Sequence, residues 1–189
     1  MGDPAEHVAI IERGLVKLAR PGAHGTSSII ALFGPNGLIG LTAVIADAKY
    51  PADAIVISPT VQIVCVAASE IRAAAATDAA FGSSFQRTLV DHTLVLLSKI
   101  EIMSAGSVAQ RLATLLVQLG ERFGSRAEAE GRTTIPFALT RAILADLVDA
   151  RVETVIRVFS TWRASNVWSA SDDGFEIDCA ALSAIALQG

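Results

Sequence analysis

The chain has little cysteine, and this scarcity excludes two kinds of site. Its two cysteines, Cys65 and Cys179, lie far apart in the 189-residue sequence. Such a pair forms neither a disulfide framework nor a cluster of metal ligands. It also cannot supply the four thiolates of an iron–sulfur centre. We therefore expect no metal site, and we expect the reducing cytoplasm as the compartment.

Long apolar runs and catalytic signatures are missing as well. No stretch reaches the length of a membrane span, and residues 1–6 do not resemble a signal peptide. The sequence contains no nucleophile elbow, phosphate-binding loop, catalytic carboxylate pair or metal motif. We expect neither a membrane partner nor an enzyme.

Positive charge is scarce, which bears on nucleic-acid binding. The net charge is −4, and residues 140–189 carry four arginines against seven acidic residues, a balance of −3. This balance counts against nucleic acid. Residues 151–163, however, hold three arginines against one glutamate. If this segment contacts DNA, we expect weak non-specific affinity and a modest dependence on salt, because few phosphates are neutralised.

Apolar residues, by contrast, are abundant, and their spacing divides the chain into three parts. Hydrophobic residues make up 52% of the sequence, enough to bury a core. Short β-like runs with Gly and Pro turns fill the first part, at residues 7–12, 28–33, 54–57 and 61–66. Ser69 is the expected N-cap of a helix over residues 70–76. A long helix over residues 83–103 is expected to continue helical through 105–123, and a polar loop then covers residues 124–131.

The most informative stretch is residues 140–163, TRAILADLVDARVETVIRVFSTWR. Apolar residues recur at helical spacing on both sides of Asp149-Ala150, which predicts two short helices joined by a tight turn. Asp149 suits that turn because Asp tolerates the left-handed conformation. We expect the first helix to bury Ile143, Leu144, Leu147 and Val148, and the second to bury Val155, Val158 and Phe159. Two such helices form a helix-turn-helix, whose second helix fits the major groove of DNA. Asp172-Asp173-Gly174 predicts a following hairpin.

These residues resemble a known family. The segment ADLVDARVETVIRVF, with Glu153, Thr154, Val155 and Arg157, resembles the recognition segment of the CRP/FNR transcription regulators. Residues 109–113 (AQRLA) resemble the helix that precedes this domain in the family. Residues 2–16 and the turn at 34–40 (GPNGLIG) resemble its β-roll. Together these motifs cover nearly the whole chain in the family's order.

The resemblance implies an α+β fold in three parts. An effector-sensing β-roll of the double-stranded β-helix or jelly-roll kind would occupy residues 1–82. A dimerisation helix would follow at 83–104, and a winged helix-turn-helix DNA-binding domain at 105–189, with the hairpin near Gly174 as its wing. The family usually has a helix and two strands before the first motif, so we expect an N-terminally truncated roll or a misassigned start.

The long helix is expected to pair two copies of the chain. Phe85, Leu89, His92, Leu96 and Met103 follow near-heptad spacing, and Val90, Leu94 and Leu97 mark an adjacent apolar stripe. Apolar residues on more than one face indicate burial on more than one side. One face would pack on the roll and another on a twin, although an ordinary core helix is the alternative. A two-fold dimer would place two recognition helices about 34 Å apart on a near-palindromic site.

The resemblance and side-chain chemistry together assign candidate DNA contacts. Arg157 suits guanine O6 and N7, Glu153 suits cytosine N4 and would also steer Arg157, and Ile156 suits a thymine methyl. Thr140, Arg141 and Arg151 are the candidates for phosphate contacts. An ordinary surface pair between Glu153 and Arg157 is the structural alternative. The resemblance implies double-stranded DNA as partner of a bacterial homodimer, and it leaves room for RNA polymerase.

The sequence does not identify the effector. Cyclic-nucleotide members of the family place Glu after the glycine that matches Gly40, and an Arg-Ser or Arg-Thr pair on the phosphate. Here those places hold Leu41 and the stretch around Ala52, while Leu96 and Leu97 replace hydroxyl donors on the long helix. We therefore expect a degenerate pocket that does not take cyclic AMP, since a buried phosphate needs a cation or several donors.

Other effectors stay open, and so does a second function. Haem would need His92, His24 or Cys65 as a ligand. For Cys65, which lies in a valine-rich strand, a buried and inert thiol is the simpler expectation. An apolar ligand, a protein partner or no effector at all are the remaining choices. The rival function is a ligand- or partner-sensing module that no longer reads DNA, which the acidic charge balance favours.

Overall fold

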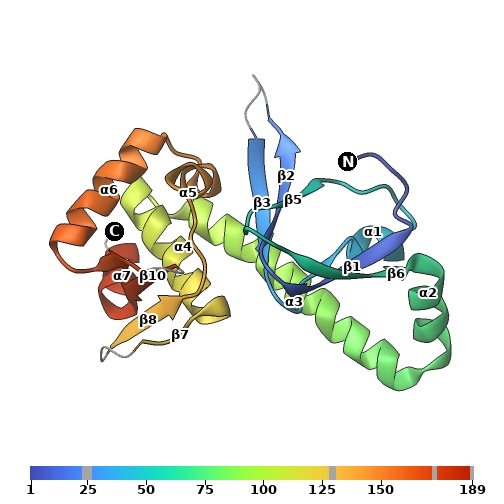
Figure 1. Cartoon of the computed structure of the whole chain (residues 1–189). Helices are drawn as coiled ribbons and strands as arrows, with labels where there is room; N and C mark the ends of the chain where they lie inside the picture. The colour runs from blue at the N-terminus through green and yellow to red at the C-terminus, as the bar shows by residue number, and fades with distance from the viewer. Residues whose placement is uncertain (23–26, 128–130, 172–173, 188–189) are drawn as a thin grey trace. The chain divides into compact units, whose positions relative to one another are not determined.

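The computed structural model describes residues 1–22, 27–127, 131–171 and 174–187 (Figure 1). The chain divides into two compact units, residues 1–97 and 98–189. Within the described residues, no helix combines the length and apolar character that crossing a bilayer requires.

The first unit is built on two three-stranded antiparallel sheets, as the β-roll prediction requires (Figure 1). One sheet has the order β4-β1-β6 and the other β3-β2-β5. The strands are β1 (His7–Arg13), β2 (Val16–Pro21), β3 (Ser27–Phe33), β4 (Leu38–Ile39), β5 (Asp53–Val56) and β6 (Gln62–Ala67). All four predicted strands are confirmed within about one residue of their bounds, while β2 and β4 were not predicted as separate strands.

The core of this unit consists of apolar side chains from the sheets and from helix α1 (Leu41–Ile45). Val8, Leu41 and Val44 belong to one cluster, and Ile11 and Phe33 to another. Cys65, which we expected to be buried, is exposed. The reason is that β6 lies at the edge of its sheet, and residues 62–65 are exposed on both faces of the strand.

Two helices follow the sheets, α2 (Ala68–Thr77) and α3 (Ala79–Ser104). The predicted N-cap at Ser69 is wrong, because α2 already begins at Ala68 after an extended Ala67. The long helix begins four residues earlier than predicted. Asp78 explains this start: its carboxylate accepts hydrogen bonds from the amides of Ala80 (2.8 Å) and Phe81 (3.1 Å).

The inner side of α3 packs on the β-roll of its own chain. His92 is 8% exposed, stacks on Phe33 with ring centroids 4.9 Å apart, and lies with Nε2 2.9 Å from the carbonyl oxygen of Leu38. Phe85 and Leu89 pack against the cluster that contains Leu41. Phe85, Leu89 and His92 therefore lie on the face of α3 that packs on the roll.

The outer side of α3 remains apolar and exposed. Val90, Leu94 and Leu97 are 58%, 56% and 50% exposed. Leu96 and Met103 of the predicted set follow His92 by four and eleven positions and share its face, and they are exposed as well, at 39% and 36%. The division arises because residues spaced by three and four share a helix face, and Val90, Leu94 and Leu97 lie on the face turned away from His92.

The second unit contains a helical layer and a small sheet. We expected the long helix to continue through residues 105–123. Instead, helix α4 (Val108–Phe123) begins as a separate helix, because Ser107 is its N-cap and forms a capping box. Its hydroxyl accepts from the amide of Gln110 at 3.2 Å, and the Gln110 side chain accepts from the Ser107 amide at 2.7 Å. Helix α7 (Cys179–Ala186) packs on α4.

The hairpin predicted as the wing is part of a four-stranded antiparallel sheet in the order β7-β8-β10-β9. Its strands are β7 (Ser125–Arg126), β8 (Arg132–Ile135), β9 (Trp168–Ala170) and β10 (Phe175–Asp178). Strands β9 and β10 pair antiparallel, with Phe175 opposite Ala170, which confirms the predicted hairpin. Asp172 and Asp173 of the predicted turn lie outside the described residues. The predicted loop over 124–131 instead contains the short strand β7.

Two glycines test how closely these elements are packed. A Cβ at Gly174 would lie 2.0 Å from the backbone oxygen of Ile135, whereas one at Gly82, within α3, would meet nothing closer than 3.6 Å. We expect Gly174→Ala to lower the free energy of unfolding by about 1–3 kcal/mol through overpacking. Gly82→Ala should raise it by about 0.5–1 kcal/mol because Ala is the better helix former. Urea titration measures both, and equal effects would contradict the packing described.

Candidate DNA-binding site

The predicted helix-turn-helix is present as α5 (Arg141–Val148) and α6 (Val152–Ala164). Thr140 caps α5: its hydroxyl oxygen accepts from the amide of Ile143 at 3.2 Å. The buried side chains are those expected from helical spacing, with two exceptions. Ile143 and Val158 are only half-buried, because they lie at the margins of the apolar faces, while Ala145 and Trp162 are buried in addition.

The turn between the two helices has the predicted left-handed residue. Asp149 has φ 49° and ψ 61°, and its amide donates to the carbonyl of Ala145. Ala150 donates to the same carbonyl at 3.0 Å. An aspartate therefore closes the turn where glycine is the easier choice, because Asp tolerates positive φ better than most residues.

Two cations donate hydrogen bonds to backbone carbonyl groups at this turn. The sequence reasoning did not assign either of them to it. Lys99 Nζ donates to the carbonyl of Leu147. Arg111 Nη1 donates to Val148 at 2.7 Å and lies 3.4 Å from the carbonyl of Asp149. The last carbonyls of a helix have no partner within the helix and carry partial negative charge, so cations stabilise them. Burial lowers the pKa of Lys99, with the Asp149 carboxylate acting in the opposite direction.

The side chains predicted to read bases lie on the exposed side of α6. Glu153 and Arg157 are exposed, and Ile156 is 48% exposed although it is apolar. Ile156 and Arg157 follow Glu153 by three and four positions, so the three side chains share one helix face. Within the described residues Glu153 and Arg157 form no ion pair with each other, so the structure does not show the predicted steering of Arg157.

The three predicted phosphate contacts differ in their surroundings. Arg151, the N-cap residue of α6, is exposed. Thr140 is exposed as well, although its hydroxyl already caps α5. Arg141 is half-buried, with its guanidinium over the rings of Phe159 and Trp168. Burial lowers the pKa of Arg141, but an arginine remains charged in proteins.

The predicted effector pocket contains residues of different character. Gly40 has φ 85°, and a Cβ there would lie 2.8 Å from the Tyr50 ring. Leu41 is 1% exposed and belongs to the core. Ala52 is half-buried, whereas Leu96 and Leu97 are exposed on α3. These residues therefore do not share one surrounding.

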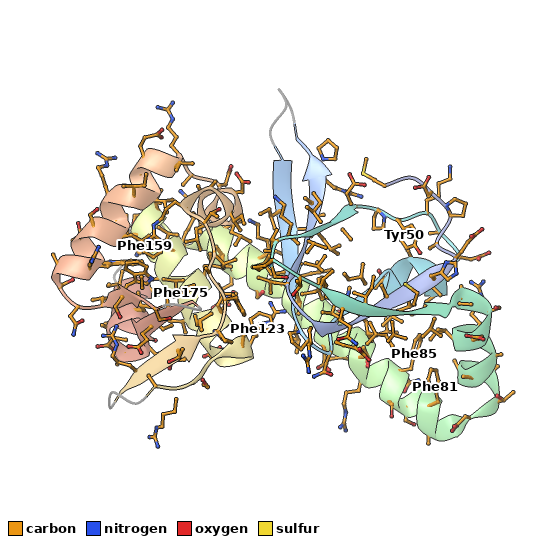
Figure 2. All side chains as sticks on the ribbon, in the orientation of Figure 1. Tyr50, Phe81, Phe85, Phe123, Phe159 and Phe175 are labelled. Carbon is orange, nitrogen blue, oxygen red and sulfur yellow. The ribbon has the colours of Figure 1, made fainter. Side chains whose placement is uncertain are left out.

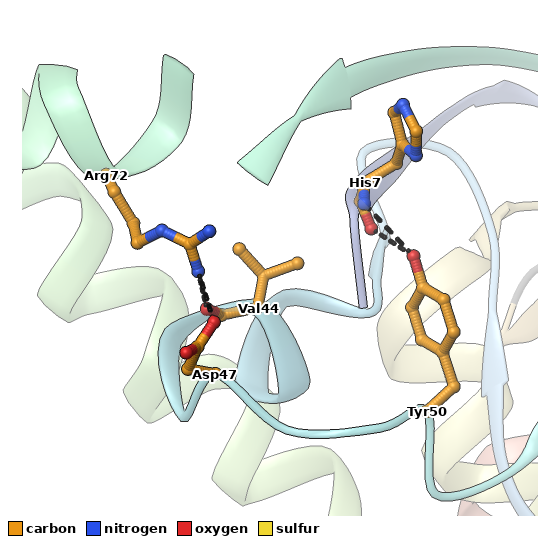
Figure 3. A network of polar contacts seen from close by, with 5 residues as sticks. All are labelled: His7, Val44, Asp47, Tyr50 and Arg72. Atoms are coloured by element: carbon orange, nitrogen blue, oxygen red, sulfur yellow. Dashed lines mark hydrogen bonds and ion pairs between the residues drawn. The ribbon is translucent and has the colours of Figure 1, made fainter. Parts of the chain in front are cut away.

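Hydrogen bonds connect the segment between α1 and β5, and the end of α1, to His7 and Arg72 (Figure 3). The Tyr50 hydroxyl donates to the carbonyl of His7 at 2.7 Å and accepts from its amide at 3.1 Å. Arg72 Nη1 donates to the carbonyl of Val44 at 2.9 Å and to the Asp47 carboxylate at 3.1 Å. The sequence reasoning missed both contacts because they join residues at least 25 positions apart.

Charged groups of both signs lie near residues 50–53. Arg20 Nε donates to the carbonyl of Pro51 at 2.6 Å, a cation that the sequence reasoning overlooked. Asp53, however, adds a carboxylate that pairs with the N-terminal ammonium of Met1.

The haem candidates within the described residues differ in their surroundings. Two of the three can be placed: His92 is packed on Phe33, and Cys65 is exposed. His24 lies outside the described residues. The described residues contain no cluster of three His, Cys, Asp or Glu side chains that would hold a metal ion.

Comparisons with known proteins agree with this architecture. Residues 1–78 match the family model of the cyclic nucleotide-binding domain, and residues 110–185 match that of the Crp-like helix-turn-helix domain. A curated relative, the CRP-like cAMP-activated global transcriptional regulator of Mycobacterium tuberculosis, is 25% identical over 154 residues, which are 82% of this chain and 67% of that protein.

Solved structures show the same fold at low sequence identity. FixK2 from Bradyrhizobium japonicum has a TM-score of 0.82 at 18% identity, over 100% of this chain and 91% of that one. A CRP-family transcriptional regulator from Thermus thermophilus has a TM-score of 0.75 at 18% identity, over 98% and 90%. The chain belongs to the CRP/FNR family of transcription regulators, with a cyclic nucleotide-binding domain and a Crp-like helix-turn-helix domain.

Asp149 provides a test of the turn geometry. A β-branched residue is strained at φ 49°, so Asp149→Val should lower the free energy of unfolding by about 1–2 kcal/mol. Asp149→Gly should leave it within about 0.5 kcal/mol, because glycine adopts positive φ readily. Asp146→Val, at an exposed position within α5, is the matched control and should have little effect. Equal losses at positions 146 and 149 would contradict the left-handed turn.

Proposed function

We propose that the protein is a homodimeric, sequence-specific regulator that binds a near-palindromic operator and that cyclic AMP is not its effector. The observation that carries the proposal is the exposed face of α6, where Glu153, Ile156 and Arg157 lie beyond a helix-turn-helix that buries its opposite side. Ile156 is an apolar side chain that stays 48% exposed between two charged ones. It suits contact with a thymine methyl in the major groove.

The roles of the individual side chains follow from their chemistry. The planar fork of Arg157 can donate two hydrogen bonds to guanine, and the Glu153 carboxylate can accept from cytosine. Arg151, Thr140 and Arg141 would hold phosphates and fix the register of the helix on the duplex. The acidic balance of residues 140–189 favours the rival function, but base readout depends on the local contact surface.

The first experiment is selection of an operator from random duplexes by the purified protein, with and without cyclic AMP. Wild type should enrich a palindromic motif, and Arg157→Ala should lose that motif with a cost of about 1–3 kcal/mol per half-site. Arg163→Ala, an exposed arginine of the same helix outside the proposed readers, is the control and should keep the motif. If neither condition enriches a motif at low salt, the rival function, a sensing module without DNA readout, is favoured.

Dimerisation is proposed to use the apolar outer side of α3. Val90, Leu94 and Leu97 are each at least half exposed and follow a four-then-three spacing, which presents one continuous stripe. Burying such a stripe against a second copy removes apolar surface from water, which is the dominant favourable term in association. Phe85, Leu89 and His92 are already used by the roll and would stabilise the helix that carries the stripe.

The dimer prediction is tested by sedimentation. Wild type should sediment as a dimer, and Leu94→Glu with Leu97→Glu should sediment as a monomer, because two charges would face two others across the stripe. Leu187→Glu, which changes an 84% exposed leucine far along the sequence, should stay dimeric. A monomeric wild type, or a dimeric double variant, would contradict the proposal.

An effector would act through the roll by shifting an equilibrium between poses of the two recognition helices. The curated relative is described as cAMP-activated, but three features argue against this ligand here. Leu41 is part of the core, residues 50–53 lack the Arg-Ser or Arg-Thr pair that holds the phosphate in cyclic-nucleotide members, and Leu96 and Leu97 offer no hydrogen bond. An apolar ligand, a protein partner or no effector at all remain the alternatives to cyclic AMP.

A further inference from the structure

Arg141 lies in a corner formed by two aromatic rings. Its Cζ atom is 3.9 Å from the ring centroid of Phe159 and 4.5 Å from that of Trp168. The two rings meet edge-on, with centroids 5.2 Å apart and an interplanar angle of 89°. Phe159 is labelled on α6 in Figure 2. Both rings are buried, at 2% and 8% exposure, so the corner is a fixed part of the DNA-binding unit.

The corner joins three parts of that unit. Arg141 is the first residue of α5, Phe159 belongs to the recognition helix α6, and Trp168 begins the wing strand β9. A guanidinium over an aromatic face is held by attraction to the ring, more strongly where water is excluded. Two perpendicular rings restrict the Arg141 side chain in two directions. The side chain therefore has less conformational entropy to lose when it binds a ligand.

The stacking leaves the hydrogen-bonding edge of Arg141 unused. Within the described part of the chain, the guanidinium contacts the two rings but forms no hydrogen bond or ion pair. Its five N–H donors point along the edge of the plane, in a fork that matches two phosphate oxygens. This differs from Arg111, whose Nη1 is already bound to carbonyls. A half-buried cation whose N–H donors form no hydrogen bond or ion pair is suited to binding an anion.

We propose that Phe159 and Trp168 are positioning residues that hold the Arg141 guanidinium in place for a phosphate of the DNA backbone. The inference rests on the proposed function and adds how this phosphate contact is organised. Because one ring comes from α6 and the other from the wing, the contact also depends on the correct placement of these two elements relative to α5. Arg151, which is exposed at the N-cap of α6, has no such support among the described contacts.

The test is a double-mutant cycle on DNA affinity. Wild type, Arg141→Ala, Phe159→Leu and the double variant are titrated against a duplex with the selected operator and a scrambled duplex of equal length. Arg141→Ala should weaken binding to both duplexes by about tenfold or more, the value of a charged hydrogen bond that is no longer made. Phe159→Leu should weaken both as well, and the double variant should be no weaker than Arg141→Ala alone.

Salt dependence gives a readout that a general loosening of packing would not change. Arg141→Ala should reduce the slope of log affinity against log salt by about 0.9 for each phosphate that the protein no longer neutralises. Phe159→Leu should reduce it too, although the net charge is unchanged. Phe175→Leu is the matched control, since Phe175 is 4% exposed and lies in the same unit without stacking on Arg141 among the described contacts. Its effect should add to that of Arg141→Ala.

Further variants keep the test decisive. If Phe159→Leu does not fold by circular dichroism, Trp168→Leu takes its place in the same cycle. Arg141→Lys keeps the charge but lacks the fork, and it should lose most of the affinity that Arg141→Ala loses. Additive losses, or an unchanged salt slope in the ring variant, would overturn the positioning role while leaving the proposed function intact. A wild type that binds neither duplex would overturn both.

Discussion

The proposed reading of DNA depends on the angle between α5 and α6, and that angle depends on one left-handed residue with its carbonyl partners. Asp149 reverses the chain at φ 49°, and the carbonyls that precede it accept from Lys99 and Arg111. Without these donors, the end of α5 would keep unpaired backbone groups in a partly buried place, which is costly. With them, Val155 and Phe159 are buried and the opposite side of α6 is left to solvent.

The structure shows how several arginines of this acidic protein are used in contacts within its own fold. Arg111 and Arg132 are bound to backbone carbonyls, and Arg141 is stacked on aromatic rings. Several cations of the DNA-binding unit therefore serve its own fold. Few are left for general attraction to DNA, since long-range attraction requires exposed charge. A regulator of this kind must gain affinity from a small number of well-placed contacts, which is consistent with holding Arg141 in place before DNA arrives.

Sequence periodicity predicted the elements well because each depends on local patterns. Four strands of the roll, the two short helices and the Asp149 turn were predicted from spacing and turn chemistry, and the structure confirms them. Element starts were less predictable, because Asp78 and Ser107 decide them through single side-chain hydrogen bonds. The division of α3 between roll and solvent was also not predictable, since both of its faces are apolar.

The surroundings of single side chains could not be predicted without the tertiary structure. Arg141 was expected at the DNA surface, but its stacking depends on Phe159 and Trp168, which are 18 and 27 residues away along the chain. Cys65 was expected inside, but its strand lies at a sheet edge. The hydrogen bonds from Arg20 to Pro51 and from Tyr50 to His7 join segments that are distant in sequence. Such contacts leave no periodic signal in the sequence.

The most direct test of the central claim, that two copies of α6 read DNA in adjacent major grooves, is a hydroxyl-radical footprint on the selected operator. We predict protected sugars in two sets related by a two-fold axis, with centres about 10 base pairs apart on one side of the duplex. A single protected set, or uniform protection along the duplex, would contradict the claim, because neither pattern arises from a symmetric pair of recognition helices.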